Sequence, residues 1–339
     1  MSTLPEGLDL SDERVPKASF STIDFALLEA RDAAELKHLL RACQTHGFFY
    51  LNFDNSESTK AIVDEKTRVQ NFMKEYFAQA TEVKMKDHLG IKTKGYIPYG
   101  TFTGLKKGDW RTVEHLMLSR WDFVSGADSV APAVRAESEL FKSYLDRCNY
   151  VVSVMLGALS DVLEVPASKR FDRGHDTSKP CDTTLAMLSY PLDIGETLQE
   201  HTDIGSMTVL FSHEFGLQVL APETHQWEFV EPRDRHAVIN VGDALRFMSD
   251  KQLYSCVHRV IRATGAYASP HRYSLAFLRR PEQEFKYKDT EGKELTAKEW
   301  HDSKYKIYYT PHEEQDSRVL LGGMERVLSG TAHNVAVTA

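Results

Sequence analysis

The sequence predicts an α+β protein with a jelly-roll core that is flanked by N-terminal and C-terminal helices. From Thr183 onward, short strand-like runs are separated by turn residues, at the spacing typical of a β-sandwich or barrel. About eight such strands in a double sheet form a jelly roll. On both sides of this region, apolar residues recur at helical spacing instead.

Residues 1–130 are expected to form an α/β region that packs on the core. An extended entry segment leads into a short strand within residues 20–28. Apolar positions at helical spacing predict an amphipathic helix over residues 31–46, which ends at Gly47. The aromatic run 48–51 follows at once and predicts a strand.

The next part of the chain is predicted to be mainly helical. A second helix is expected over about residues 57–80, before an aromatic-rich loop at 92–104 and a strand at 110–118. Residues 131–180 are expected to hold a long helix, from about 132 to 163, and a connector.

The jelly-roll core is predicted to span residues 181–282, and residues 283–339 are expected to hold C-terminal helices and a tail. In the latter region, a charged loop at 281–295 precedes a helix at about 297–308 and a short helix near 320–328. The predicted core strands are TTLAMLSY, LQEHTD, MTVLFS, GLQVL, WEFVE, HAVIN, ALRFMS, SCVHRVIRA and RYSLAFLRR.

Composition limits the classes of protein that the chain could represent. The 339 residues, 42% hydrophobic and 27% charged, are ordinary for a globular protein with a large core. A net charge of −8 argues against a broad nucleic-acid-binding face. No apolar run has the length of a membrane span or a secretory signal. Four cysteines without regular spacing favour a reduced setting, so we expect a soluble cytoplasmic protein of open oligomeric state.

The candidate site is centred on the run LQEHTDIGSMTVLF. His201 and Asp203 lie two residues apart in a strand-like run, so their side chains should leave the same face. His258 lies in another such run and can reach them only if the sheet curls over itself, as a jelly roll does. Two histidines and one carboxylate form the ligand set of non-heme Fe(II) oxygenases. Taken alone, a His-x-Asp tripeptide is more often a surface histidine beside a turn aspartate, and only the other observations favour a metal site.

Arg272 and Ser274 lie on the last predicted strand and should point to one face. A guanidinium fork beside a hydroxyl suits a carboxylate. An Arg-x-Ser alone is most simply part of an exposed strand, and its place one strand after His258 is what favours a binding role.

Several segments resemble, in order and spacing, the isopenicillin N synthase-like 2-oxoglutarate/Fe(II)-dependent dioxygenases. In the core they are HTDIGSMTVLF, GLQVL, INVGDALRFMSDKQLYSCVHRV and RYSLAFLRRP. The runs HGFFYLNF and KGYIPYG, and GDW followed by Glu114, are also similar, so the resemblance covers roughly residues 20–310.

This resemblance implies a double-stranded β-helix (jelly-roll) core, with Fe(II) bound by the His-x-Asp pair and His258. It implies that Arg272 and Ser274 hold the C5 carboxylate of 2-oxoglutarate, and that Tyr190 lies near this co-substrate. The implied reaction uses O2 to hydroxylate, desaturate or rearrange a small organic molecule and releases succinate and CO2. Specialised metabolism is the expected setting, with catabolic and hormone-modifying roles also open.

The substrate is not predicted by the sequence. The chain departs from the family pattern at Leu188, where asparagine is common, and in the Phe277-Leu278 pair, where both residues are commonly aromatic. Arg280 could reach the pocket mouth and favour an anionic or polar oxygenated substrate, or it could be a simple exposed arginine. The candidate pocket residues, for each of which ordinary packing is an equal alternative, are Tyr99, Phe102, His115, Leu188, Leu278 and Arg280.

Two other interpretations of the site stay open. The protein could be a 2-oxoglutarate-independent non-heme iron oxidase on the same fold. It could also be a non-catalytic jelly roll with a structural metal such as zinc, since two histidines and an aspartate can bind zinc. A purely structural metal would not need the Arg-x-Ser pair beside it.

Overall fold

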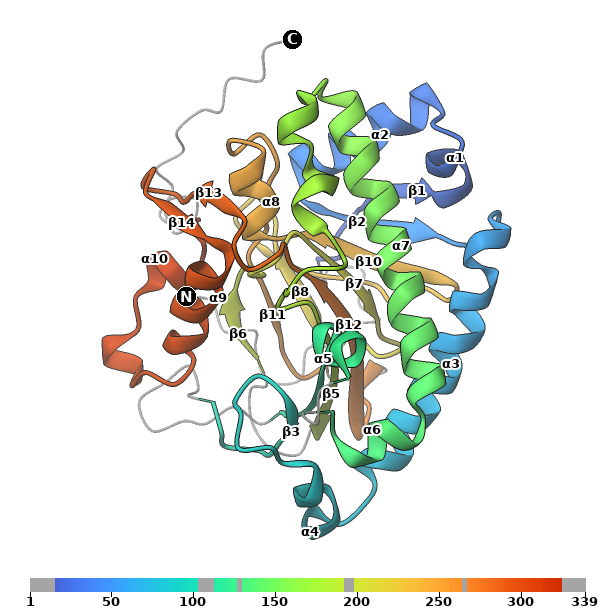
Figure 1. Cartoon of the computed structure of the whole chain (residues 1–339), viewed down its shortest axis with the longest axis vertical. Helices are drawn as coiled ribbons and strands as arrows, with labels where there is room; N and C mark the ends of the chain where they lie inside the picture. The colour runs from blue at the N-terminus through green and yellow to red at the C-terminus, as the bar shows by residue number, and fades with distance from the viewer. Residues whose placement is uncertain (1–15, 103–112, 127–129, 192–197, 264–266, 325–339) are drawn as a thin grey trace.

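The core is a jelly roll of eight strands in two facing sheets, as the sequence predicted (Figure 1). The computed structural model describes residues 16–102, 113–126, 130–191, 198–263 and 267–324. One core sheet has the order β10-β7-β12-β5 and the other the order β6-β11-β8-β9. The core strands are β5 (Thr184–Pro191), β6 (Leu198–His201), β7 (Met207–Phe211), β8 (Leu217–Leu220), β9 (Trp227–Phe229), β10 (His236–Val241), β11 (His258–Val260) and β12 (His271–Arg279).

The N-terminal part of the chain adds strands to both edges of the larger core sheet. Strands β1 (Thr22–Asp24) and β2 (Phe48–Asn52) extend it beyond β10, and β4 (Glu114–Ser119) and β3 (Gly95–Ile97) extend it beyond β5. Among these strands, only β1 and β2 pair in parallel. As a result, β4 lies beside β5 and contributes to the same wall of the core.

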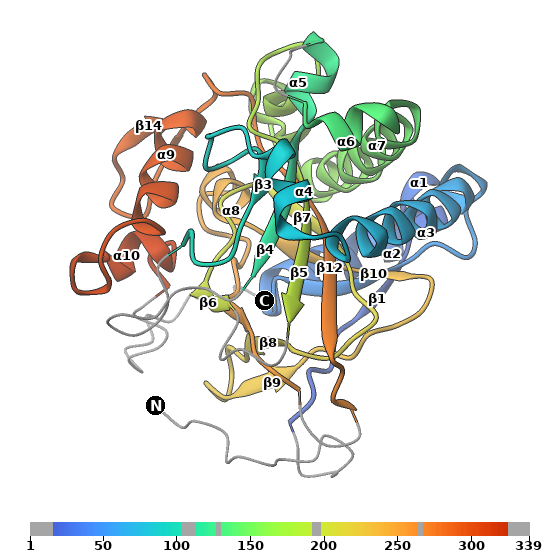
Figure 2. The ribbon, with the colours of Figure 1, turned by 90° about the horizontal axis from the view of Figure 1, so that it is seen from below.

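Helices cover the outer face of the larger sheet, as Figure 2 shows. They are α2 (Ala33–Thr45), α3 (Glu57–Phe77) and α7 (Ser138–Val162). Side chains alternate between the two faces of a strand. On β12, Leu275 and Phe277 therefore pack in the apolar cluster with these helices, whereas Ala276 packs in the cluster inside the jelly roll.

A C-terminal layer covers the opposite side of the core. Helix α9 (Ala297–Ile307) begins at a capping box formed by Thr296 and Glu299, and α10 (Ser317–Leu320) follows it. The remaining helices are α1 (Phe25–Glu29), α4 (Thr81–Lys84), α5 (Arg120–Ser125), α6 (Pro132–Ala136) and α8 (Asp243–Met248). Short 3-10 turns lie at Met85–Asp87, Ala167–Lys169, Phe171–His175 and His312–Glu314.

Two predictions for the C-terminal half were wrong. The run ALRFMS was predicted as a strand but forms helix α8, because its buried residues Ala244, Leu245 and Phe247 have helical spacing. The predicted loop at 281–295 contains the hairpin of β13 (Lys286–Lys288) and β14 (Glu294–Thr296).

Three predictions for the N-terminal half were partly right. Within residues 20–28, the strand ends at Asp24, because the carboxylate of Asp24 accepts hydrogen bonds from the first backbone N–H groups of α1. The long helix at 132–163 is divided at Glu137 into α6 and α7. The strand predicted at 110–118 runs from Glu114 to Ser119, and residues 110–112 lie outside the described residues.

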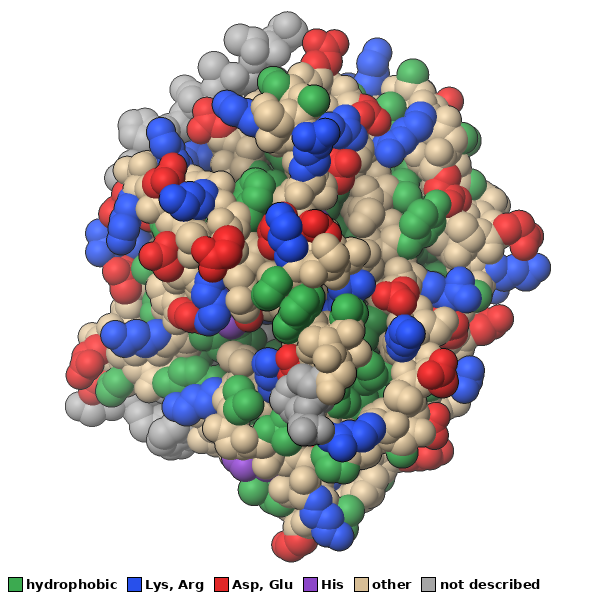
Figure 3. Space-filling model, viewed as in Figure 1, with side chains coloured by type: hydrophobic (Ala, Val, Ile, Leu, Met, Phe, Trp, Pro, Cys, Tyr) green, Lys and Arg blue, Asp and Glu red, His purple; other side chains and the backbone are tan. Residues whose placement is uncertain are grey.

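The surface matches the mixed charge of the sequence. On the face in Figure 3, acidic and basic side chains are interspersed, and hydrophobic side chains form separate groups. This face therefore offers no continuous basic surface of the kind that nucleic-acid binding uses. Among the described residues, none of the helices combines the length and the apolar character that crossing a membrane requires.

Candidate active site

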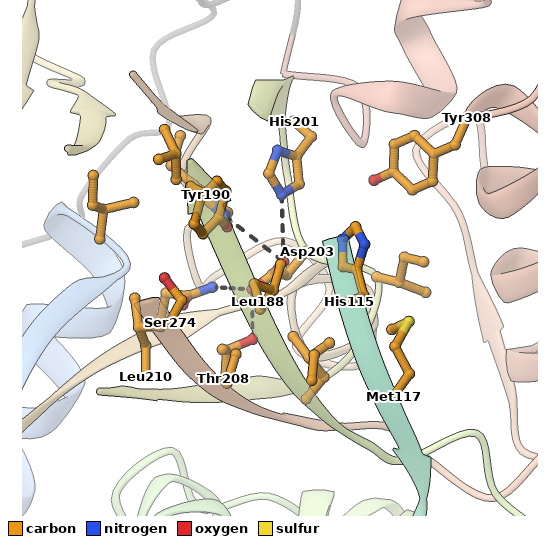
Figure 4. Close-up of a pocket in the computed structure, with 18 of the residues that line it drawn as sticks. His115, Met117, Leu188, Tyr190, His201, Asp203, Thr208, Leu210, Ser274 and Tyr308 are labelled. Carbon is orange, nitrogen blue, oxygen red and sulfur yellow. Dashed lines mark hydrogen bonds and ion pairs between the residues drawn. The ribbon is translucent and has the colours of Figure 1, made fainter. Parts of the chain in front are cut away.

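His201, Asp203 and His258 meet at one end of the smaller core sheet. Figure 4 shows His201 and Asp203 side by side. His201 is the last residue of β6 and His258 the first of β11, and the two are directly opposite in this antiparallel pair. Asp203 lies just beyond the strand end, so the predicted placement of both residues within one strand was right only for His201. One ligand atom from each side chain lies within 4.8 Å of the others.

Hydrogen bonds fix which atoms of these side chains face one another. Asp203 accepts through Oδ2 from Thr208 Oγ1 at 2.5 Å and from Asn240 Nδ2 at 2.7 Å. Its Oδ1 is left 3.8 Å from the Nε2 atoms of both His201 and His258. His258 donates from Nδ1 to the backbone carbonyl of Cys256 at 3.1 Å, which directs Nε2 towards the centre of the cluster.

Electrostatics keep the carboxylate of Asp203 ionised. Its burial acts to raise the pKa, but His258 and His201, with the hydrogen bonds from Asn240 and Thr208, lower the pKa to about 2. An ionised carboxylate and two imidazoles are the donor set that suits non-heme Fe(II). The arrangement therefore fits a divalent metal with coordination positions left free on the cavity side.

Arg272, Ser274 and Tyr190 form a second group of neighbouring side chains, which lines the same cavity as the metal-ligand candidates. Arg272 Nη1 donates to Ser274 Oγ at 2.5 Å, and the Arg272 guanidinium lies 5.1 Å from the ring centre of Tyr190. Arg272 is 1% exposed, and its Nε has no hydrogen-bond partner among the described residues. Burial lowers the pKa of Arg272. A buried cation with an unused donor fits an anionic ligand such as the carboxylate of 2-oxoglutarate.

A cavity of about 140 Å³ connects these two groups of residues. Most of the remaining wall is apolar, with Leu188 and Leu278 on neighbouring strands and Phe102 packed edge-on against His115 at 5.1 Å between ring centres. Arg280 also lines the cavity and is only 4% exposed, so the interpretation as a simple exposed arginine was wrong. Five of the six predicted pocket residues therefore lie in the cavity wall.

Tyr99 is the exception among the predicted pocket residues. It does not line the cavity, and its side chain belongs to a hydrogen-bonded group around Glu114. Tyr99 donates to Glu114 Oε1 at 3.1 Å, while Tyr96 and Lys84 both donate to Glu114 Oε2 at 2.7 Å. This group ties the loop around Tyr99 to β4.

Some residues that shape the site were not predicted. Asn240 and Thr208 orient Asp203, and their polar side chains on otherwise apolar buried strands are a signal that sequence inspection could have used. Tyr305 and Tyr308 line the cavity from α9 and its end. Nothing in the sequence around these two tyrosines indicates that they line a cavity, because only the tertiary fold brings α9 to the core.

Fold and site together define an oxygenase of the non-heme iron class, and comparison with known proteins identifies the family. The family model of the 2OG-Fe(II) oxygenase superfamily matches residues 181–281. The family model described as "non-haem dioxygenase in morphine synthesis N-terminal" matches residues 20–122.

Two curated fungal relatives align over most of the chain. An oxidoreductase of Penicillium aethiopicum, vrtI, is 39% identical over 319 residues, which cover 92% of this chain and 76% of that protein. The 2-oxoglutarate-dependent dioxygenase frbH of a Dothideomycetidae species is 37% identical over 319 residues, which cover 93% of this chain and 98% of that protein.

Solved structures support the fold. A 2OG-Fe(II) oxygenase family protein from Caulobacter crescentus superposes with a TM-score of 0.70 at 23% identity, covering 86% of this chain and 99% of that one. The rice dioxygenase for auxin oxidation superposes with a TM-score of 0.63 at 21% identity, covering 88% of this chain and 98% of that one.

The chain therefore belongs to the 2OG-Fe(II) oxygenase superfamily. It is an oxidoreductase of the 2-oxoglutarate-dependent dioxygenase type, with Fe(II) as its metal and 2-oxoglutarate as its co-substrate. The resemblance drawn from the sequence is confirmed.

Proposed function

We propose that this enzyme oxidises a small organic molecule of specialised metabolism, with His201, Asp203 and His258 as its iron ligands. The observation that carries the proposal is that this ligand cluster and the buried Arg272 open into one cavity. The two curated fungal relatives, an oxidoreductase and a 2-oxoglutarate-dependent dioxygenase, support the reaction class. We keep the cytoplasm as the proposed location, since all four cysteines are buried and unpaired.

The co-substrate role is assigned to Arg272 and Ser274. Arg272 would bind the distal carboxylate of 2-oxoglutarate through its guanidinium, and Ser274 would donate its hydroxyl to the same group. Tyr190, whose ring lies beside the guanidinium, would limit the positions that the bound carboxylate can take. When bound, Fe(II) and 2-oxoglutarate supply the activation of O2, and the protein supplies binding and orientation.

The cavity wall would select and place the substrate. Leu188, Leu278 and Phe102 provide apolar surface next to the ligand cluster, and His115 stands beside them on β4. Such a wall excludes water from the reacting centre and fits an organic molecule with an apolar body. The outcome, whether hydroxylation, desaturation or ring rearrangement, would depend on which carbon this wall presents.

The test is an anaerobic titration of metal-free protein with Fe(II) and then 2-oxoglutarate, followed by visible absorption. We expect a weak charge-transfer band that is lost in His201→Ala and in Arg272→Ala. The matched controls are His225→Ala and Arg41→Ala, which replace exposed residues and should keep the band. Iron binding without a band would favour an oxidase that does not use 2-oxoglutarate, and absence of iron binding would favour a structural metal.

A further inference from the structure

One strip of alternate residues runs along the cavity wall and has an arginine at each end. It consists of Arg272, Ser274, Ala276, Leu278 and Arg280, all of which line the cavity. Residues two apart on a strand share a face, so the strip follows the geometry of β12 and continues to Arg280, the residue directly after the strand. Both arginines are buried, with 1% of Arg272 and 4% of Arg280 exposed.

The guanidinium groups of the two arginines contact different levels of the sheet. Arg272 contacts Ser274, and Arg280 contacts Thr184, which pairs with Leu278, four residues and about 13 Å further along β12. The five-carbon chain of 2-oxoglutarate spans only about 6 Å, given carbon–carbon bonds of about 1.5 Å. If Arg272 binds this co-substrate, Arg280 is left for a different chemical group.

Arg280 is held in place by neutral partners. Its Nη1 donates to the backbone carbonyl of Asp182 and to Thr184 Oγ1, the latter at 2.9 Å. The hydroxyl of Tyr305 is a further hydrogen-bond partner. Its Nε is buried and has no partner among the described residues. The side chain is therefore fixed at the cavity wall with donor capacity unused.

No described carboxylate neutralises this guanidinium through an ion pair. The carboxylate of Asp182 accepts hydrogen bonds from Gln283 Nε2 at 3.1 and 3.2 Å instead. The positive charge of Arg280 also acts on His301: burial and Arg280 lower the pKa of His301 to about 4, against the opposing effect of the Asp182 and Asp302 carboxylates. A buried cation without a carboxylate partner is costly, and an anion bound in the cavity would offset that cost.

We propose that Arg280 is a specificity-determining residue that binds a carboxylate on the organic substrate. This inference rests on the proposed function, because it requires that Arg272 be occupied by 2-oxoglutarate. Leu188, Leu278 and Phe102 would contact the apolar body of the substrate. The cavity of about 140 Å³ also has to hold 2-oxoglutarate beside Arg272, which leaves room only for a small molecule. The substrate class is therefore a small organic acid with an apolar body.

Calorimetry with matched acids and amides tests this directly. Full-length protein is loaded anaerobically with Fe(II) and saturating 2-oxoglutarate, then titrated with phenylacetate and phenylacetamide, and with 4-phenylbutyrate and 4-phenylbutanamide. We expect at least one acid to bind about tenfold or more tightly than its amide, as a charge-assisted hydrogen bond provides. If neither acid is preferred over its amide, including the case in which nothing binds, the proposal is overturned.

Substitutions at Arg280 test whether this residue causes the preference for the acid over its amide. Arg280→Gln should remove the preference for the acid, and Arg280→Lys, which keeps the charge, should retain part of it. Arg41→Gln, an exposed control on α2, should behave as wild type. An acid preference that survives in Arg280→Gln overturns the proposal. If Arg280→Gln does not fold, Arg280→Lys and the wild-type comparison still provide the test.

The visible band of the Fe(II)–2-oxoglutarate complex, recorded in the same samples, separates the two proposals. A wild-type band that persists in Arg280→Gln while the acid preference is lost supports both. Loss of the band in Arg280→Gln would overturn the inference, because Arg280 would then serve the co-substrate. A wild-type protein without the band contradicts the proposed function, and the titrations repeated in Arg272→Ala then report on Arg280 alone.

Discussion

Asn240 donates from Nδ2 to Oδ2 of Asp203 at 2.7 Å, and this bond determines which oxygen of the carboxylate faces the two histidines. Oδ2 is held by Asn240 and Thr208, and Oδ1 remains at 3.8 Å from both imidazoles. The metal-facing geometry of Asp203 therefore depends on Asn240 of β10 and Thr208 of β7.

The first prediction follows from this bond. Replacing Asn240 with leucine should weaken Fe(II) affinity by about 10- to 100-fold, the usual effect of removing a partner that orients a metal ligand. Competition with a chelator under anaerobic conditions measures the affinity. Thr208→Val should act in the same direction, and Asn55→Ala, at an exposed site, should have no effect. Unchanged affinity in Asn240→Leu would mean that Asp203 keeps its orientation without this bond.

The second prediction concerns the ion pair between Lys304 of α9 and Asp243 of α8. Its atoms are 2.5 Å apart, and both side chains are fully buried. Lys304→Met leaves the carboxylate of Asp243 buried without its partner and should lower the free energy of unfolding by about 3–5 kcal/mol. Urea unfolding followed by circular dichroism measures this change.

The same helix offers a matched control for this prediction. Lys298→Met removes an exposed ion pair with Asp302 and should change the free energy of unfolding by less than about 1 kcal/mol. The double variant Lys304→Met with Asp243→Asn should recover part of the loss, since it removes the unpaired charge. Equal, small effects at Lys304 and Lys298 would contradict the assigned role of the buried pair.

The third prediction concerns the space around Gly242. A Cβ at this position would lie 2.3 Å from the carbonyl oxygen of Gly205 and 3.0 Å from that of Asp203, and backbone atoms cannot easily move. Gly242→Ala should therefore destabilise the fold by about 1–3 kcal/mol and weaken metal binding. Gly157→Ala is the control, since its new Cβ would meet only the ends of the Arg31 and Arg170 side chains. Thermal unfolding and Fe(II) titration of both variants provide the comparison.

The fourth prediction is a loss of stability in acid that originates at His175. Burial, with a contribution from Arg279, lowers its pKa to about 3. Its Nδ1 donates to the carbonyl of Phe171 and its Nε2 accepts from Ser206 Oγ, both at 2.7 Å, which is the pattern of a neutral imidazole. Below its ordinary pKa of 6.5, the unfolded chain binds a proton at this position and the folded protein does not.

The stabilising contribution of neutral His175 is therefore complete above pH 6.5 and declines towards pH 3. Between pH 7 and pH 5 the loss should be about 2 kcal/mol. Urea unfolding across this range should show a shallower decline in His175→Asn than in wild type. The decline should persist in His225→Asn, an exposed control. An identical pH dependence in His175→Asn and wild type would refute the assignment.

The residues that sequence analysis located best are those whose signals are local. The His-x-Asp pair and Arg272-x-Ser274 each lie within a single run, and strand alternation predicts their common direction. His258 required the additional expectation that the sheet curls, which the many short strands supplied. The prediction of a strand at ALRFMS was wrong because a short, largely apolar run fits both a strand and a short helix.

The surroundings of Arg280 show what the sequence could not reveal. Its side of the strand was predictable from the alternation along β12, but its burial was not. Tyr305, which covers it, comes from α9 and meets it only in the folded protein. The prediction that Tyr99 lines the pocket was wrong for the same reason. Its hydrogen-bond partner Glu114 lies on β4, which meets the loop around Tyr99 only in the folded protein.

The buried contacts of Lys304 have a consequence for synthesis of the chain. Lys304 Nζ also donates at 2.6 Å to the hydroxyl of Thr202, the residue between His201 and Asp203. While the ribosome still holds α9, a nascent chain has all three metal ligands but lacks this support. The metal position can therefore reach its final shape only after α9 has emerged, and until then the unfinished protein is a poor competitor for cellular iron.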